Sequence, residues 1–125
     1  MDDEEFQNYI DEAVASLPDE FRKMLENVEI LVDDYPTAEQ LVRSHAQNGM
    51  LLGLYEVIPK TRRGHYGVGP TLPDRITIFR YPIFAIARSK EHAIDLIKAT
   101  VKHEIAHHFG MNEEAVRKAE AKRRG

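Results

Sequence analysis

The spacing of apolar residues predicts two helices and a strand in the first part of the chain. Residues 3–16 carry apolar side chains three or four positions apart, which is typical of an amphipathic helix. Pro18 suits the first turn of a second helix that extends to about Glu26, and the acidic residues after it favour the positive end of that helix. The apolar, β-branched run 27–33 indicates a strand.

The pattern in residues 37–80 predicts a short helix followed by two strands. Thr37 can cap a helix that extends through Arg43. Residues 51–58 indicate a second strand, in which Gly53 marks a bulge or a point of close approach. Residues 74–80 alternate polar and apolar side chains, which predicts a third strand with one face in water.

The last third of the chain predicts a long helix between two shorter ones. Residues 83–87 suit a short helix, and Ser89 is a candidate N-cap for the long one. The long helix extends to Phe109, after which Gly110 is a natural left-handed stop. A last helix is expected over 112–122.

These elements indicate an α+β fold in which a small sheet is flanked by helices. We expect residues 1–125 to form a single domain, because the chain is too short for two ordinary domains. The one long irregular stretch is 59–73, which contains three glycines and three prolines. Loops of this length in compact domains are often functional.

The composition excludes some kinds of metal site and argues against some classes of protein. The chain has no cysteine, which excludes disulfides and thiolate ligands and leaves histidine and carboxylate to hold any zinc. The formal net charge of −4 argues against nucleic acid as a partner. We expect no membrane span, because no run of about 18 apolar residues occurs. An acidic N-terminus unlike a signal peptide favours a cytoplasmic protein.

The most informative motif lies in the long predicted helix. His103, Glu104 and His107 form H-E-x-x-H. Two histidines four residues apart lie on one face of a helix and can bind one metal ion. Glu104 is displaced by about 100° around the helix, so its carboxylate can act as general base on a water molecule at the metal without itself being a ligand. In the alternative interpretation, all three are ordinary solvated helix residues.

The long helix has two occupied faces when its residues are placed at about 100° intervals. One face is expected to pack on the core, with His108 as a hydrogen-bonded packing histidine, and the other to turn the histidine pair toward a cleft. The core face comprises Ile94, Ile97, Val101, Ile105 and His108, and the opposite face comprises Leu96, Thr100, His103 and His107.

A third metal ligand is expected just after this helix. A left-handed Gly110 turns the chain sharply, so Glu113 can return to the metal, with the adjacent Glu114 as a competitor. Two histidines and one carboxylate leave one tetrahedral position open, which separates catalytic zinc sites from structural ones.

Four further residues are candidates for supporting roles. Tyr55 and Tyr66 could donate to a developing oxyanion, and Thr100 and Asp95 could orient a ligand histidine. The alternative for each is an ordinary position in a strand, loop or helix.

Almost the whole chain resembles the small bacterial zincin-like metallopeptidases, also called minimal metalloproteases. The segment after H-E-x-x-H is also similar to the metzincins, but Glu113 stands where they have a histidine and no methionine turn follows. The resemblance implies a compact α+β domain with a small mixed sheet and a central zinc helix. It further implies that an edge strand, either 74–80 or 51–58, pairs with extended substrate. The matching stretches are 17–21, 27–33, 52–55, 72–78 and 101–110.

The sequence therefore predicts a zinc-dependent metallopeptidase. His103, His107 and Glu113 bind Zn²⁺, and Glu104 is the general base. A chain of this size has little wall for a deep cleft, so short peptides or flexible protein segments are the expected substrates of a protein that is a monomer by default. The alternative is a metal-binding scaffold or regulatory interaction module with weak or no catalysis. A nucleic-acid-binding helical module is disfavoured by the acidic balance.

Overall fold

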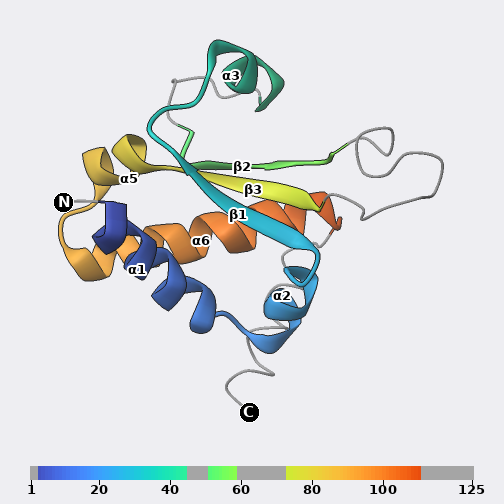
Figure 1. The fold of residues 1–125 in the computed structure, drawn as a ribbon, viewed down its shortest axis with the longest axis horizontal. Helices are drawn as coiled ribbons and strands as arrows, with labels where there is room; N and C mark the ends of the chain where they lie inside the picture. The colour runs from blue at the N-terminus through green and yellow to red at the C-terminus, as the bar shows by residue number, and fades with distance from the viewer. Residues whose placement is uncertain (1–2, 45–50, 59–72, 111–125) are drawn as a thin grey trace.

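The computed structural model describes residues 3–44, 51–58 and 73–110. Its described part contains a three-stranded mixed sheet of order β1-β3-β2 (Figure 1). Strand β1 (Val28–Asp33) is parallel to β3 (Asp74–Phe79), and β2 (Gly53–Glu56) is antiparallel to β3. The predicted α+β class and the mixed sheet are confirmed, and the three strands lie where the sequence pattern indicates.

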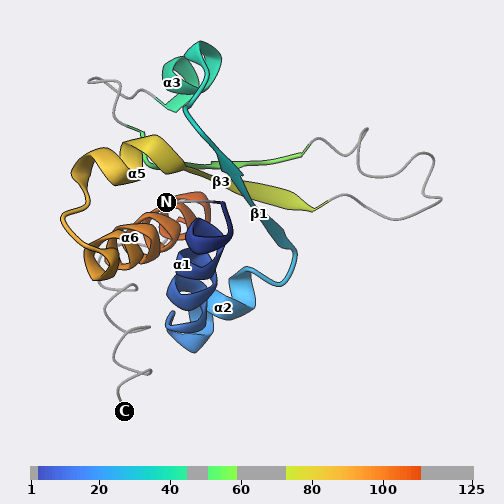
Figure 2. The ribbon, with the colours of Figure 1, turned by 60° about the vertical axis from the view of Figure 1, so that its left-hand side comes forward.

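The helices divide between the two sides of the sheet. The N-terminal helices α1 and α2 and the long helix α6 lie on one side, and α3 lies on the other (Figures 1 and 2). None of the helices in the described ranges is long and apolar enough to span a membrane. The bounds are α1 Asp3–Ala15, α2 Asp19–Met24, α3 Ala38–Ser44, α5 Arg80–Ile86 and α6 Lys90–His108.

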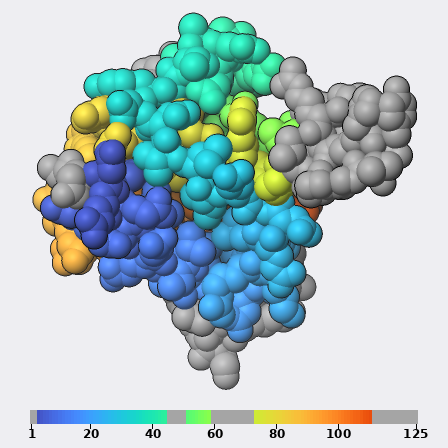
Figure 3. Space-filling view, viewed as in Figure 1, coloured from blue at the N-terminus to red at the C-terminus, as the bar shows by residue number. Residues whose placement is uncertain are grey.

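The hydrophobic core lies between the sheet and the helices α1 and α6. Ile76 and Ile78 project from the same face of β3 and are fully buried. Ile97, Val101 and Ile105 repeat every four residues along α6 and are also fully buried. The atoms of α1 and α2 form a continuous surface below β1 in Figure 3. This packing fixes one face of α6 against the sheet and leaves another face for the cleft.

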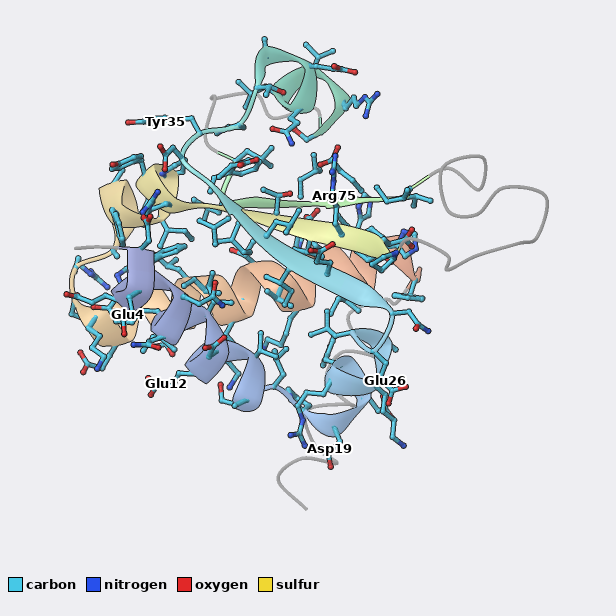
Figure 4. The ribbon with its side chains drawn as sticks, viewed as in Figure 1. Glu4, Glu12, Asp19, Glu26, Tyr35 and Arg75 are labelled. Carbon is cyan, nitrogen blue, oxygen red and sulfur yellow. The ribbon has the colours of Figure 1, made fainter. Side chains whose placement is uncertain are left out.

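The prediction that one face of β3 is in water is wrong. Ile76 to Phe79 are all buried, and Thr77, on the face away from the core, is only 2% exposed. The reason is that β3 is the central strand, with β1 on one side and β2 on the other. Arg75 projects on the outer side (Figure 4), with its Nε 3.5 Å from Oε1 of Glu56 on β2.

Side chains cap two of the helices. Ser89 Oγ accepts a hydrogen bond from the His92 amide at 3.0 Å, which confirms the predicted N-cap of α6. His92 Nδ1 accepts from the Arg88 amide at 2.9 Å, a role that the sequence pattern did not indicate. At α3, Thr37 and Gln40 form reciprocal backbone to side-chain bonds, which is a capping box.

The C-terminal end of α6 also follows its prediction. Gly110 has a φ of +67°, in the left-handed region that favours glycine. Its amide donates to the carbonyl of His107 at 3.3 Å. The predicted helix 112–122 and nearly all of the loop 59–73 lie outside the described residues.

Candidate metal centre and its cleft

The two histidines of H-E-x-x-H lie on the same side of α6. The ring centroids of His103 and His107 are 6.5 Å apart, and the ring planes differ by 18°. Both side chains are exposed. Their four-residue spacing and the regular helix produce this arrangement, because residues i and i+4 differ by only about 40° around the helix axis.

The pair opens into a cleft of about 910 Å³ between α6, β2 and the C-terminal end of α3. Helix α6 contributes His103, Glu104 and His107 to its lining, and residues 51–57 contribute an entire wall. Arg43 and Ser44 close the side of the cleft at α3. The candidate chemistry and a strand edge therefore share one concave surface, which is the usual setting of a small-molecule or peptide site.

Glu104 is held by the backbone of the edge strand. Its Oε1 accepts a hydrogen bond from the amide of Tyr55 at 2.9 Å, and its side chain is half-buried. A carboxylate bonded to a backbone amide has a fixed orientation, which a solvated helix residue lacks. This contact argues against the interpretation of Glu104 as an ordinary surface charge.

His108 is not the packing histidine that the helical pattern predicted. It is exposed, and its ring stacks on Tyr55 with centroids 3.9 Å apart and planes 13° from parallel. Its place on the helix explains the error. His108 lies about 40° beyond Glu104, among the core positions of the helical repeat, but it is the last residue of α6 and the core does not cover it.

Two supporting roles predicted from sequence are not seen. The hydroxyl of Tyr55 donates to Oδ2 of Asp74 at 2.8 Å, so its hydrogen is not directed at a reacting group. Thr100 Oγ1 donates to the carbonyl of Leu96 at 2.7 Å, within its own helix, and not to a histidine. Asp95 is exposed on α6, and Tyr66 lies outside the described residues.

Thr100 and Gly53 instead allow helix and strand to approach closely. A Cβ on Gly53 would lie 2.6 Å from Cγ2 of Thr100, closer than real Cβ contacts come. Gly53 is buried at the start of β2, so of its two predicted roles the structure shows the close approach. This approach brings the Tyr55 amide within reach of Glu104.

The donor set of the described residues fits two positions of a metal site. His103 and His107 supply two imidazole nitrogens, which suit zinc. Among the described residues, no group of three or more His, Cys, Asp or Glu side chains gathers around one point. The predicted third ligand Glu113 and its competitor Glu114 lie outside the described residues, and Gly110 has the conformation that the predicted turn toward them requires.

Comparison with known proteins places the chain in a family. No match was found among curated proteins. Residues 25–123 match a family model described as zincin-like metallopeptidase, a range that includes all three strands and the H-E-x-x-H helix. The family implies a metal cofactor and a hydrolase that acts on peptides. Because the match spans most of its 125 residues, the chain belongs to the zincin-like metallopeptidase family.

Proposed function

We propose that this protein is a zinc-dependent peptidase in which His103, His107 and Glu113 bind Zn²⁺ and Glu104 is the general base. The observation that carries the proposal is the cleft, where both histidines and the amide-held Glu104 face the same space as an edge strand. Glu114 remains the alternative third ligand.

Zinc, when bound, supplies a Lewis acid that activates water and polarises a peptide carbonyl. Glu104 accepts the proton of the attacking water and passes it to the leaving amine. The Tyr55 amide donates to Oε1, and we assign the proton transfer to the other oxygen, Oε2. His103 and His107 line the same cleft as Glu104, and with Glu113 they would hold the metal beside the base.

Strand β2 is the edge strand that we propose for substrate binding. Strand β3 pairs on both sides, whereas β2 pairs with β3 alone in the described sheet. The amide of Phe79 donates to the carbonyl of Leu52 at 2.9 Å, so alternate residues of β2 direct their backbone groups away from β3. The residues so directed are Gly53 and Tyr55 within β2, and the Tyr55 amide already donates to Glu104.

An extended peptide therefore pairs with the carbonyls and amides on either side of that contact, by β-augmentation. The cleft is bounded by short elements, which suits short peptides or flexible protein segments better than folded proteins. We propose a monomer that acts in the cytoplasm, without a nucleic-acid partner.

The test measures how much metal is bound to protein purified without chelator, and how much zinc the metal-free protein binds when zinc is added. The wild type is expected to hold one zinc per chain, and His103→Ala and His107→Ala to lose it. Glu113→Ala and Glu114→Ala identify the third ligand, and His45→Ala is the control, because His45 has no partner at metal spacing in the sequence.

Glu104→Gln separates binding from catalysis. It should keep zinc and reduce cleavage of a peptide library by about 100-fold or more, because it removes the proton acceptor. A folded wild type that binds no zinc would refute the peptidase. Stoichiometric zinc without cleavage that depends on Glu104 would favour the metal-binding scaffold instead.

A further inference from the structure

Helix α6 and strand β2 meet along one line of contacts, which we name the β2–α6 seam and define by Gly53, Tyr55, Thr100, Glu104 and His108. Its three helix residues repeat every four positions and therefore lie along one stripe of α6. Each contacts β2 in a different way. Thr100 meets the bare backbone of Gly53, Glu104 accepts the Tyr55 amide, and His108 stacks on the Tyr55 ring.

Tyr55 takes part in most of these contacts and is itself anchored to β3. Its hydroxyl donates to Oδ2 of Asp74 at 2.8 Å, and Oδ1 of the same carboxylate accepts from the Ile58 amide at 3.1 Å. The Asp74 carboxylate thus binds both the Tyr55 side chain on β2 and the backbone just after β2. The ring of Tyr55 is fixed at its hydroxyl by the sheet and rests with its face on the last turn of α6.

We propose that Tyr55 is a positioning residue for the candidate base. Its ring, placed between Asp74 and His108, holds the C-terminal turn of α6 against β2 and so keeps the Glu104 carboxylate on the Tyr55 amide. The same turn carries His107 and leads to Gly110, where the chain changes direction. The proposal rests on the proposed function for its catalytic consequence, but the contacts themselves need no metal.

The first experiment tests the seam in the metal-free protein by amide hydrogen exchange. The amide at position 55 faces away from β3, so Glu104 is its protein acceptor, whereas the Leu54 amide faces β3. Tyr55→Leu removes the ring and keeps the amide. It should lower protection at position 55 by about tenfold or more, corrected for side-chain identity, and leave protection at Leu54 unchanged.

Two further variants and a control make this result specific. His108→Ala removes the other half of the stack at an exposed site, and it should reproduce the loss even if Tyr55→Leu does not fold. Tyr55→Phe keeps the ring on His108 and should retain most of the protection. Tyr35→Leu is the control, because Tyr35 is an exposed tyrosine between β1 and α3, stacked on Tyr81 (Figure 4).

The second experiment asks whether the seam matters for the metal. Zinc affinity and the visible spectrum of the Co²⁺-substituted protein are compared among the same variants. Tyr55→Leu and His108→Ala should weaken zinc binding by about 10–100-fold and alter the Co²⁺ bands. This is the size of effect expected when a residue that is not a ligand fixes the orientation of the ligands. Tyr55→Phe and Tyr35→Leu should resemble the wild type.

The outcomes separate this inference from the proposed function. Unchanged protection at position 55 in folded Tyr55→Leu and His108→Ala would overturn the positioning role, whatever the metal result. Lost protection together with a wild-type Co²⁺ spectrum and zinc affinity would overturn its extension to the metal site. A wild type that binds neither metal would refute the peptidase, and the exchange result would then still decide whether Tyr55 holds Glu104.

Discussion

Gly53→Ala tests how closely strand β2 and helix α6 must approach. The added Cβ would lie 2.6 Å from Cγ2 of Thr100, 3.1 Å from the carbonyl oxygen of Thr77 and 3.2 Å from Cδ1 of Ile78. Ordinary contact begins at 3.4 Å, so the gap to Thr100 must open by about 0.8 Å. Thr100 cannot simply rotate, because its hydroxyl is bonded to the carbonyl of Leu96 and its side chain is β-branched.

The helix must therefore move away from the strand. Overpacking of this kind costs about 1–3 kcal/mol of unfolding free energy. In a domain of this size each kcal/mol lowers Tm by roughly 3–5 °C. The same displacement lengthens the bond from the Tyr55 amide to Glu104, so exchange at position 55 should rise in parallel.

A double-mutant cycle with Thr100→Ser identifies the contact responsible. This change removes Cγ2 and keeps the hydroxyl, so it should recover about 1 kcal/mol or more of the loss, while costing at most about 1 kcal/mol alone. Thr100→Val is the control, because it keeps a methyl at the point of contact and should not rescue. The free energy of unfolding is measured in urea, with circular dichroism as the probe of the transition. Additivity of Gly53→Ala and Thr100→Ser within about 0.5 kcal/mol would refute the reasoning.

Three further predictions concern the scaffold of the same helix, each measured as the free energy of unfolding in urea. Gly110→Ala should cost about 1 kcal/mol, because alanine at a φ of +67° is strained, and Gly110→Asn should cost less; equal stability of the two would contradict this. Ser89→Ala should cost about 0.5–2 kcal/mol by leaving the His92 amide without its cap, whereas Ser89→Asp should not. Ile105→Ala should cost about 2–5 kcal/mol, because Ile105 is fully buried on the core face of α6, opposite the histidine pair. A cost below about 1 kcal/mol would show that α6 is not anchored there.

Local signals in the sequence predicted the elements well, because their causes are local. Ser89 caps α6 through a bond to the residue three positions on, and Gly110 stops the helix through its own backbone freedom. Both effects act within one helical turn. The histidine pair is of the same kind, since the spacing of His103 and His107 on a regular helix determines that they share a face.

Errors arose where a residue's environment depends on the order of the strands. The alternation in 74–80 is that of a strand with one face in water, but β3 is central and its outer face is covered. Strand order also decides between the two candidate edge strands, and the sequence pattern left both open. The prediction for His108 is wrong for a related reason, because the helical repeat does not reveal that this last residue of α6 is exposed and stacks on Tyr55.

The β2–α6 seam also determines how the catalytic hypothesis should be tested. Thr100, Glu104 and His108 repeat every four residues and contact β2, whereas His103 and His107 repeat with the same spacing one residue earlier. All five residues line the cleft. In the proposed function, H-E-x-x-H therefore combines two roles, metal ligation by its histidines and attachment to the strand by its glutamate. Glu104→Ala would remove the proposed general base and the acceptor of the Tyr55 amide together, so lost activity could reflect a displaced strand. Glu104→Gln keeps a carbonyl oxygen for that amide and removes only the basic group, and it alone attributes a loss of cleavage to proton transfer.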